Sequence, residues 1–224
     1  LQDRVLHDPD TFSQLLQYMT IPVSEMFRDP AYFSGLREHV VPVLRTYPSI
    51  RIWVAGCSTG EEVYSLAILL REEGLADRSL IYATDINPVS LAKAREGIFP
   101  IDAMRLYTSN YQKSGGKAAF SDYYTAAYGN ALFDRSLCAN VTFADHSLAT
   151  DSVFAETHLV SCRNVLIYFN RGLQDRAIGL FRESLVHRGF MGLGSKESIE
   201  FSVHAEGFEA VARRERIYRK AGVA

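Results

Sequence analysis

A glycine-rich segment followed by two acidic residues, VAGCSTGEEVYS at 54–65, is the first place where ligand chemistry is expected. In a turn that leads from a strand into a helix, small residues let the backbone approach a ligand, and the helix N-terminus offers free N–H groups. Gly56 and Gly60 are four residues apart, which is not the GxGxxG spacing. Because Glu61 and Glu62 put negative charge where a pyrophosphate would lie, the segment favours a ligand with a cationic group over NAD. The alternative is a plain turn that needs glycine for its geometry.

A second acidic position, Asp85 in ATDIN at 83–87, follows another apolar run. A carboxylate at the end of the second strand typically accepts hydrogen bonds from ribose hydroxyls. The alternative is that Asp85 caps the next helix. Asn87 directly precedes Pro88 and is the better cap, so we expect Asp85 to be available to a ribose.

The segment SCRNVLIYFN at 161–170 supplies a third group of polar residues. In a doubly wound sheet the strand after the crossover pairs beside the first strand, so Arg163 and Asn164 would face Gly56 across the point where ligands bind. The alternatives are a structural arginine–carboxylate pair and, for Tyr168, a place in the core.

A fourth segment, IPVSEMFRDPAYF at 21–33, places Arg28 among apolar neighbours. An arginine in such surroundings needs an anionic partner, which could be a ligand. A salt bridge to Glu25 or Asp29 is the alternative.

Other reactive residues carry little signal. The six histidines show no ligand spacing and CxxC and HExxH are absent, so we predict no metal site. Cys57, Cys138 and Cys162 are odd in number and widely spaced, which argues against a disulfide framework.

Short apolar, β-branched runs alternate with segments of helical periodicity. The runs are continuous rather than alternating, which predicts a parallel sheet covered on both faces. The expected strands are 50–55, 80–84, 141–144, 157–162 and 189–193. One helix is predicted after Gly60, ending near Gly74, and another presents Leu173, Ala177, Phe181 and Leu185 on one face.

The two ends and one internal segment depart from this alternation. Helices are expected near 11–19 and 30–46, the second capped by Asp29, with Pro30 in its first turn and a kink or end at Pro42. Residues 208–212 and 216–220 predict a terminal antiparallel hairpin. The tyrosine-rich segment 107–140 predicts a small β insertion.

Composition bounds the function. The 224 residues include 24 Lys and Arg and 26 Asp and Glu, and the resulting net charge of −2 argues against nucleic acid as a partner. We see no signal peptide and no apolar run of bilayer-spanning length, so a cytoplasmic protein without direct membrane insertion is expected. Because the chain does not begin with Met, we expect it to be a piece of a longer protein.

Together the four segments resemble the CheR family of chemotaxis-receptor glutamate methyltransferases. The family's FFRD, AGCSTGEEPYS, ATDI and CRNVxIYF motifs correspond to MFRDP at 26–30, AGCSTGEEVYS at 55–65, ATDIN at 83–87 and SCRNVLIYF at 161–169. LGSKES at 193–198 resembles a later GHSE segment. The resemblance implies a Rossmann-like S-adenosylmethionine methyltransferase fold with seven mostly parallel strands and an antiparallel C-terminal hairpin.

The resemblance also implies a site. It places Ser24 and Arg28 at the methionine end of the cofactor, Asp85 on its ribose, and Tyr168 near the transferred methyl group. Arg28 and Tyr168 are the expected catalytic residues. The implied cofactor-binding residues are Ser24, Arg28, Gly56, Glu61, Glu62, Asp85, Ser147, Leu148, Arg163 and Asn164.

Two positions depart from the family pattern. Pro22 replaces an Asn that would donate a hydrogen bond to the cofactor, and Ser147 replaces the Asn of an Asn-Leu pair on the adenine side. We expect residues 1–48 to be linker and helices leading from an absent N-terminal domain, and 49–224 to be the catalytic domain. The insertion resembles a subdomain that some members use to bind a receptor's C-terminal peptide.

The implied reaction moves a methyl group from S-adenosylmethionine to glutamate carboxylates of methyl-accepting receptors, leaving S-adenosylhomocysteine. The implied partners are the cytoplasmic domains of those receptors, and the enzyme is expected to be a monomer. A non-catalytic S-adenosylmethionine-binding or receptor-binding module is the alternative, and a nicotinamide dehydrogenase is a more distant one.

Overall fold

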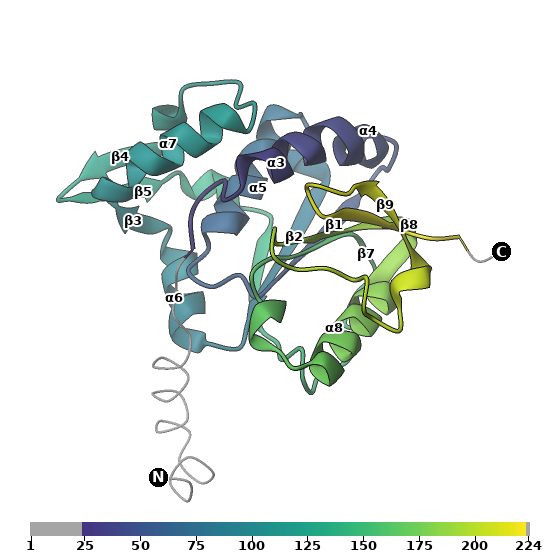
Figure 1. Cartoon of the computed structure of the whole chain (residues 1–224). Coiled ribbons are helices and arrows are strands. Elements are labelled where there is room, and N and C mark those ends of the chain that lie inside the picture. The colour runs from purple at the N-terminus through teal and green to yellow at the C-terminus, as the bar shows by residue number, and fades with distance from the viewer. Residues whose placement is uncertain (1–23, 223–224) are drawn as a thin grey trace, which may run out of the picture.

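The computed structural model describes residues 24–222 (Figure 1). Its main body is one seven-stranded sheet with the order β6-β2-β1-β7-β8-β10-β9. Strands β6, β2, β1, β7 and β8 are parallel, and β10 is antiparallel to both β8 and β9. The predicted fold is therefore confirmed. The strands are Ile50–Ala55 (β1), Ser79–Asp85 (β2), Val141–Asp145 (β6), Thr157–Cys162 (β7), Leu185–Leu193 (β8), Phe208–Ala212 (β9) and Ile217–Lys220 (β10).

Strand β1 explains why both faces of the sheet are covered. Ile52 and Val54 belong to one core, and Trp53 and Ala55, whose side chains point the other way, belong to a second. The helices α3, α4 and α5 pack on the first core and α8 on the second, as the two sides of the sheet in Figure 1 show. The main helices are Pro30–Gly35 (α3), Val41–Leu44 (α4), Glu61–Glu72 (α5), Pro88–Glu96 (α6), Met104–Lys113 (α7) and Arg171–Ser184 (α8).

The boundary between α8 and β8 differs from the prediction. Leu185 was expected on the helix face, but it is the first residue of β8 and pairs with Thr157. Its side chain is buried in the same core as Phe181, on the preceding helix. Apolar periodicity could not tell the end of the helix from the start of the strand, because both conformations place Leu185 in that core.

The helix predicted over 30–46 is interrupted just before Pro42. A π-helical turn, Leu36–Val40, joins α3 to α4, and Pro42 lies in the first turn of α4. Pro30 occupies the first turn of α3 as predicted. The predicted capping by Asp29 is wrong, because its side chain makes no cap hydrogen bond and its carboxylate binds Arg163 instead. The helix predicted near 11–19 lies outside the described residues.

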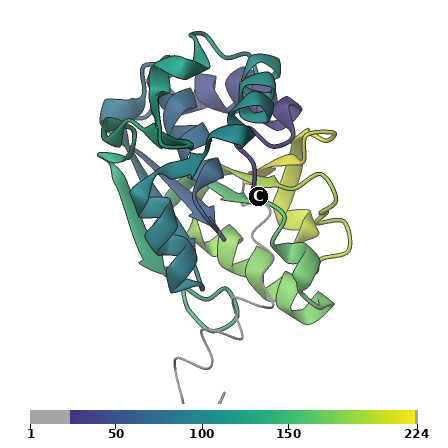
Figure 2. The same ribbon diagram turned by 90° about the vertical axis from the view of Figure 1, so that its left-hand side faces the viewer.

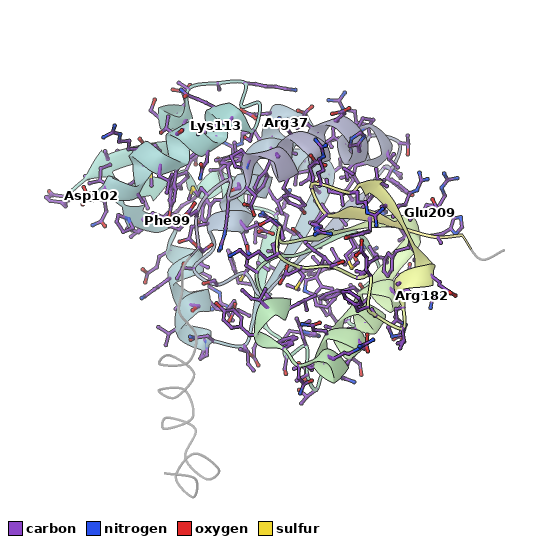
Figure 3. All side chains as sticks on the ribbon, in the orientation of Figure 1. Arg37, Phe99, Asp102, Lys113, Arg182 and Glu209 are labelled. Carbon is purple, nitrogen blue, oxygen red and sulfur yellow. The ribbon has the colours of Figure 1, made fainter. Side chains whose placement is uncertain are left out.

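A small second sheet projects from one end of the molecule, where Figure 3 labels Phe99 and Asp102. Its order is β3-β5-β4, all antiparallel. The sheet begins earlier than the predicted insertion at 107–140, and that segment starts with helix α7 rather than a strand. Two of the sheet's three strands, β4 and β5, do lie within the predicted segment, and Tyr124 begins β4. Tyr107 and Tyr111 instead lie four residues apart on one buried face of α7. The strands are Ile98–Pro100 (β3), Tyr124–Ala127 (β4) and Asn130–Phe133 (β5).

One carboxylate anchors this small sheet to the main body. Glu72, at the end of α5, accepts hydrogen bonds from the hydroxyls of Tyr111 and Tyr123 and from the N–H of Lys117, and it pairs with Arg37. Figures 2 and 3 show α3, α5 and α7 from two sides, and Figure 3 labels Arg37 and Lys113.

No helix within residues 24–222 has the length and apolar character needed to cross a bilayer.

Candidate active site

A pocket of about 470 Å³ opens where the first strands of the sheet end. Its walls come from the residues that follow β1, β2, β6 and β7, and β1 lies between β2 and β7 at this point. Open α/β sheets bind ligands in such a crevice. All the predicted site residues except Glu61 line it, namely Ser24, Arg28, Gly56, Glu62, Asp85, Ser147, Leu148, Arg163, Asn164 and Tyr168.

Gly56 is required by the turn at the pocket floor. It has φ +74°, and a Cβ atom there would lie 2.4 Å from Cγ2 of Val165. The N–H groups of Gly56 and Cys57 both donate to the carbonyl of Thr84, which joins the ends of β1 and β2. A side chain at position 56 would therefore both strain the backbone and push the 163–168 loop away.

Asp85 organises the loops around it. Its Oδ2 accepts the N–H of Ser58 at 2.8 Å and its Oδ1 accepts the N–H of Asn87 at 2.9 Å. The predicted cap role of Asn87 is confirmed, because its Oδ1 accepts the N–H groups of Val89 and Ser90. The N–H of Ile86 also donates to this carboxylate, so one of its roughly four acceptor sites remains for a ligand hydroxyl. Burial raises the pKa of this carboxyl above its ordinary value.

The two adjacent glutamates take different roles. Glu61 is buried, is not part of the pocket wall, and accepts hydrogen bonds from the hydroxyls of Thr59 and Ser24. Burial raises its pKa. Glu62 faces the pocket, one helical position away. The sequence could not show which of Glu61 and Glu62 faces the pocket. Side chains at adjacent helix positions differ in direction by about 100°, and only the packing fixes which one faces a ligand.

Glu62 is part of a chain of hydrogen bonds that passes through Ser161 on β7 and ends at Tyr32 on α3. Ser161 donates its hydroxyl to Oε1 of Glu62 at 2.6 Å, so the hydroxyl of Tyr32, 2.7 Å from Ser161, must be the donor in that pair. Arg163 pairs with the other carboxylate oxygen at 3.1 Å. Ser161 and Arg163 thus fix the position of the Glu62 carboxylate.

Arg163 clamps the segment that carries Arg28. Its side chain is 1% exposed, lies 4.2 Å from the ring centroid of Tyr32, and donates to the carbonyl oxygen of Arg28 at 2.9 Å and to Asp29 at 2.8 Å. The alternative of a structural arginine–carboxylate pair is therefore realised at Arg163, with two carboxylates. Of the two acidic partners considered for Arg28, Asp29 binds Arg163.

Backbone strain gathers around the pocket. Phe27, Asp29, Ser58 and Asn164 have φ between 48° and 60° without being glycine. Such conformations persist only where the surroundings enforce them, and they cluster at functional sites. Phe27 and Asp29 flank Arg28, and Asn164 follows Arg163, so the strained positions present these side chains in a fixed direction.

Tyr168 is not a core residue. It ends the short 3₁₀ helix η6 (Leu166–Tyr168), and 66% of its surface is exposed at the pocket mouth. Its core alternative is therefore wrong. Elsewhere in the pocket wall, the N–H of Ser147 donates to Asp151, and Leu148 is buried.

Glu197 was not predicted as a site residue, although it lies in the segment LGSKES at 193–198 described above. Glu197 is 4% exposed, and its carboxylate accepts the N–H groups of Asn164, Leu166 and Gly194 at 3.0, 2.8 and 2.6 Å. It therefore holds the loop that carries Tyr168. The signal available in the sequence was an acidic residue in a short loop of small and polar residues.

His146 was also missed, because its spacing suggests no ligand role. It lines the pocket with its ring edge-on to Trp53 and Phe154, and its Nε2 lies 3.2 Å from the carbonyl oxygen of Ser152. It contributes shape to the wall beside Ser147.

Cys57 lines the pocket as a thiol. Burial and the neighbouring Asp85 raise its pKa, and burial also raises the pKa of Cys138 and Cys162. Because the thiolate is the reactive form, we expect iodoacetamide at pH 7.5 to label the native protein about 10²-fold more slowly than free cysteine. Mass spectrometry of labelled peptides would measure this, with urea-unfolded protein as the control. Labelling of native Cys57 at the rate of free cysteine would contradict it.

The pocket suits a ligand that carries a cation and a ribose. The positive charge of Arg163 is shared between Glu62 and Asp29, while Asp85 adds a carboxylate at the end of β2. Backbone N–H groups stand at the start of α5, and apolar Leu148 and Val165 line the walls.

Comparison with known proteins identifies the family. The profile of the CheR methyltransferase, SAM binding domain, matches residues 22–216. The chain belongs to the CheR methyltransferase family. The matched domain is the one that binds S-adenosylmethionine, which replaces the nicotinamide alternative.

Two relatives in sequence agree with this assignment. The chain is 68% identical over 98% of its length to Cher3 of Pseudomonas putida, covering 81% of that protein. It is 31% identical over 88% of its length to a chemotaxis protein methyltransferase of Listeria monocytogenes, covering 71% of it. Among solved structures, the N-methyltransferase NodS of Bradyrhizobium japonicum with S-adenosyl-l-homocysteine matches with a TM-score of 0.49, at 13% identity over 88% of this chain and 89% of that one.

Proposed function

We propose that this CheR methyltransferase transfers the methyl group of S-adenosylmethionine to glutamate side-chain carboxylates of methyl-accepting chemosensory receptors. The products are glutamate methyl esters and S-adenosylhomocysteine. The observation that carries the proposal is that Arg28 and Tyr168 line the same pocket as the cofactor-binding segments. Relatives named chemotaxis protein methyltransferases support the receptor substrate. The proposal includes a cytoplasmic, monomeric enzyme whose catalytic domain is residues 49–224, preceded by a linker at 1–48.

In this proposal the pocket holds the cofactor along its length. Asp85 binds the ribose hydroxyls, Ser147 and Leu148 border the adenine, and Glu62 lies opposite the cationic end. Ser24, Arg28, Gly56 and Asn164 complete the wall, while Glu61 acts from behind by holding Ser24. Arg163 acts through Glu62 and the carbonyl of Arg28 rather than through a ligand.

The chemistry needs positioning rather than a base. When bound, S-adenosylmethionine supplies a methyl group on a sulfonium. The acceptor carboxylate is already ionised near pH 7, since its ordinary pKa is about 4.3. Arg28 neutralises and aligns that carboxylate, and Tyr168 donates its hydroxyl to one of its oxygens. Holding the reacting atoms in line can contribute about 7–11 kcal/mol.

Binding of S-adenosylhomocysteine tests the cofactor site and should depend on pH. Burial raises the pKa of Asp85, so this carboxyl becomes protonated at a higher pH than an ordinary aspartate. The ionised form accepts ribose hydrogen bonds, so we expect affinity measured by calorimetry to fall as pH is lowered through that raised pKa. The pKa of Asp85 is higher in the folded state than in the unfolded state, so protonating this carboxyl stabilises the folded protein. The expected loss of affinity at low pH therefore does not come from unfolding driven by Asp85.

Asp85→Asn is the matched control. It should bind more weakly, by roughly tenfold, and show a flatter pH dependence. Binding to the wild type with no pH dependence would contradict the role of Asp85.

Transfer of methyl groups to the soluble cytoplasmic fragment of a methyl-accepting chemotaxis receptor, located by mass spectrometry, tests the reaction. Cofactor binding without transfer would favour the non-catalytic module.

A further inference from the structure

The side chain of Tyr168 is placed by the backbone that carries it. It is largely exposed, and its hydroxyl makes no hydrogen bond with another residue of the described range 24–222. Tyr168 is the last residue of the short helix η6. Whatever fixes the backbone of η6 therefore also fixes where the hydroxyl stands relative to the pocket.

The carboxylate of Glu197 binds the backbone of this helix and of the turn before it. It accepts the N–H groups of Asn164 at 3.0 Å and of Leu166 at 2.8 Å, and the N–H of Ile167 also donates to it. A further bond comes from the N–H of Gly194, in the loop that carries Glu197. One side chain thus joins the loop after β8 to three of the four residues that precede Tyr168.

The loop that carries Glu197 is shaped around this contact. A Cβ atom at position 194 would lie 2.8 Å from Oε2 of Glu197 and 2.9 Å from the backbone nitrogen of Asn164, so only glycine leaves room there. Burying a carboxylate costs free energy unless hydrogen bonds compensate, and the backbone N–H groups supply that compensation. Removing the acceptor would leave those N–H groups buried and unsatisfied.

A second side chain holds the same helix by its carbonyl groups. The side-chain amide of Gln174, on α8, donates to the carbonyl oxygens of Leu166 at 2.9 Å and Phe169 at 3.1 Å. Asn164 has φ +60°, a conformation that its surroundings must enforce. Because Gln174 binds no N–H group, Glu197 is the side chain whose bonds hold the strained start of this segment.

We propose that Glu197 is a positioning residue for methyl transfer, which holds η6 so that the hydroxyl of Tyr168 meets the acceptor carboxylate. This inference rests on the proposed function. Glu197 does not line the pocket, so it acts on the reaction through Tyr168 and not by contact with cofactor or acceptor. Its effect on the rate should therefore depend on the presence of the Tyr168 hydroxyl.

The test measures Glu197→Gln with and without Tyr168→Phe, using the soluble cytoplasmic fragment of a methyl-accepting chemotaxis receptor as acceptor. Glutamine has the same size, but it keeps one acceptor oxygen and turns an NH₂ group toward a backbone N–H. We expect kcat to fall about tenfold when Tyr168 is present and less than about twofold in the Tyr168→Phe background. KM for the fragment and the affinity for S-adenosylhomocysteine should stay within about threefold.

A purely structural role predicts a different result. Glu197→Gln would then lower kcat by the same factor in both backgrounds, and that outcome overturns the proposal while leaving the proposed function standing. Loss of S-adenosylhomocysteine binding in the folded variant would also overturn it, because the effect would lie in the cofactor site. If Glu197→Gln does not fold, Glu197→Asp replaces it. Aspartate keeps the charge with a shorter reach, so its smaller loss should depend on Tyr168 in the same way.

The matched control is Glu200→Gln. Glu200 lies three residues further along the same loop, is exposed and pairs with Arg213 at 2.7 Å. It makes the same chemical change without touching η6, so it should leave kcat unchanged in both backgrounds.

The position of Tyr168 can also be followed without the reaction. In protein labelled with 3-fluorotyrosine, the fluorine signal of Tyr168 is identified by its absence from Tyr168→Phe. With S-adenosylhomocysteine bound, it should shift or broaden in Glu197→Gln and match the wild type in Glu200→Gln. A wild type that methylates nothing refutes the proposed function, and this spectrum then decides about Glu197. A changed signal supports its hold on Tyr168, and an unchanged signal overturns the positioning role in either case.

Discussion

Replacing Arg163 by alanine is expected to lower the free energy of unfolding by about 3–5 kcal/mol and to abolish binding of S-adenosylhomocysteine. The guanidinium is buried and joins Glu62, Asp29 and the carbonyl of Arg28. Its loss leaves Glu62, with a side chain only 15% exposed, without a cationic partner. The strained segment around Arg28 also loses its clamp. Urea denaturation followed by the fluorescence of Trp53, together with calorimetry, would measure both effects.

The control for this prediction is Arg219→Ala. Arg219 pairs with Glu209 at 3.2 Å near the surface, where Figure 3 labels Glu209 at the far end of the sheet. A partly exposed pair of this kind contributes about 0–1 kcal/mol. The stability lost in Arg163→Lys should lie between the losses in Arg163→Ala and Arg219→Ala. Lysine keeps the positive charge but cannot bridge two carboxylates and a carbonyl. An Arg163→Ala variant no less stable than Arg219→Ala would show that the clamp does not stabilise the site.

Arg28→Ala and Tyr168→Phe are each expected to lower the rate of methyl transfer by about 10²-fold while leaving the melting temperature within a few degrees of wild type. Tyr168 is 66% exposed, so removing its hydroxyl should cost the fold little. Arg28 lines the pocket, and in the proposed reaction it binds the acceptor carboxylate. Initial rates with the receptor fragment and thermal unfolding would be measured together.

Tyr128→Phe is the matched control, because it removes the hydroxyl of a fully exposed tyrosine on the β4–β5 turn. It should leave the rate unchanged. For Tyr168→Phe, binding of S-adenosylhomocysteine should also stay unchanged, since the proposed mechanism has the hydroxyl contact the acceptor and not the cofactor. Wild-type rates in both the Arg28 and Tyr168 variants would remove these residues from the mechanism.

Much of the sheet could be predicted because its strands are buried on both faces. Strands β1, β7 and β9 begin and end at the predicted residues. Continuous apolar runs have no other stable place in a chain of this composition. The errors fall where two states bury the same side chains, at Leu185 and in the segment that begins with α7.

The candidate site divides in the same way. The motifs predicted which residues gather at the carboxyl ends of the strands, because topology alone brings those ends together. They did not predict the roles of Arg163, which was expected to face a ligand, or of Asp29, which was expected to cap a helix. Both side chains are used instead in one ion-pair cluster with Glu62. Such partners come from segments more than 100 residues apart, and local patterns do not record them.

The sequence by itself determined the sheet, the crevice at its carboxyl edge and the class of ligand, because short motifs and apolar periodicity encode them locally. Only the tertiary structure decided which of Glu61 and Glu62 faces the pocket, and how Arg163 and Glu197 hold the loops of Arg28 and Tyr168. The physical reason is that side-chain direction, burial and ion pairing are fixed by distant elements packed together.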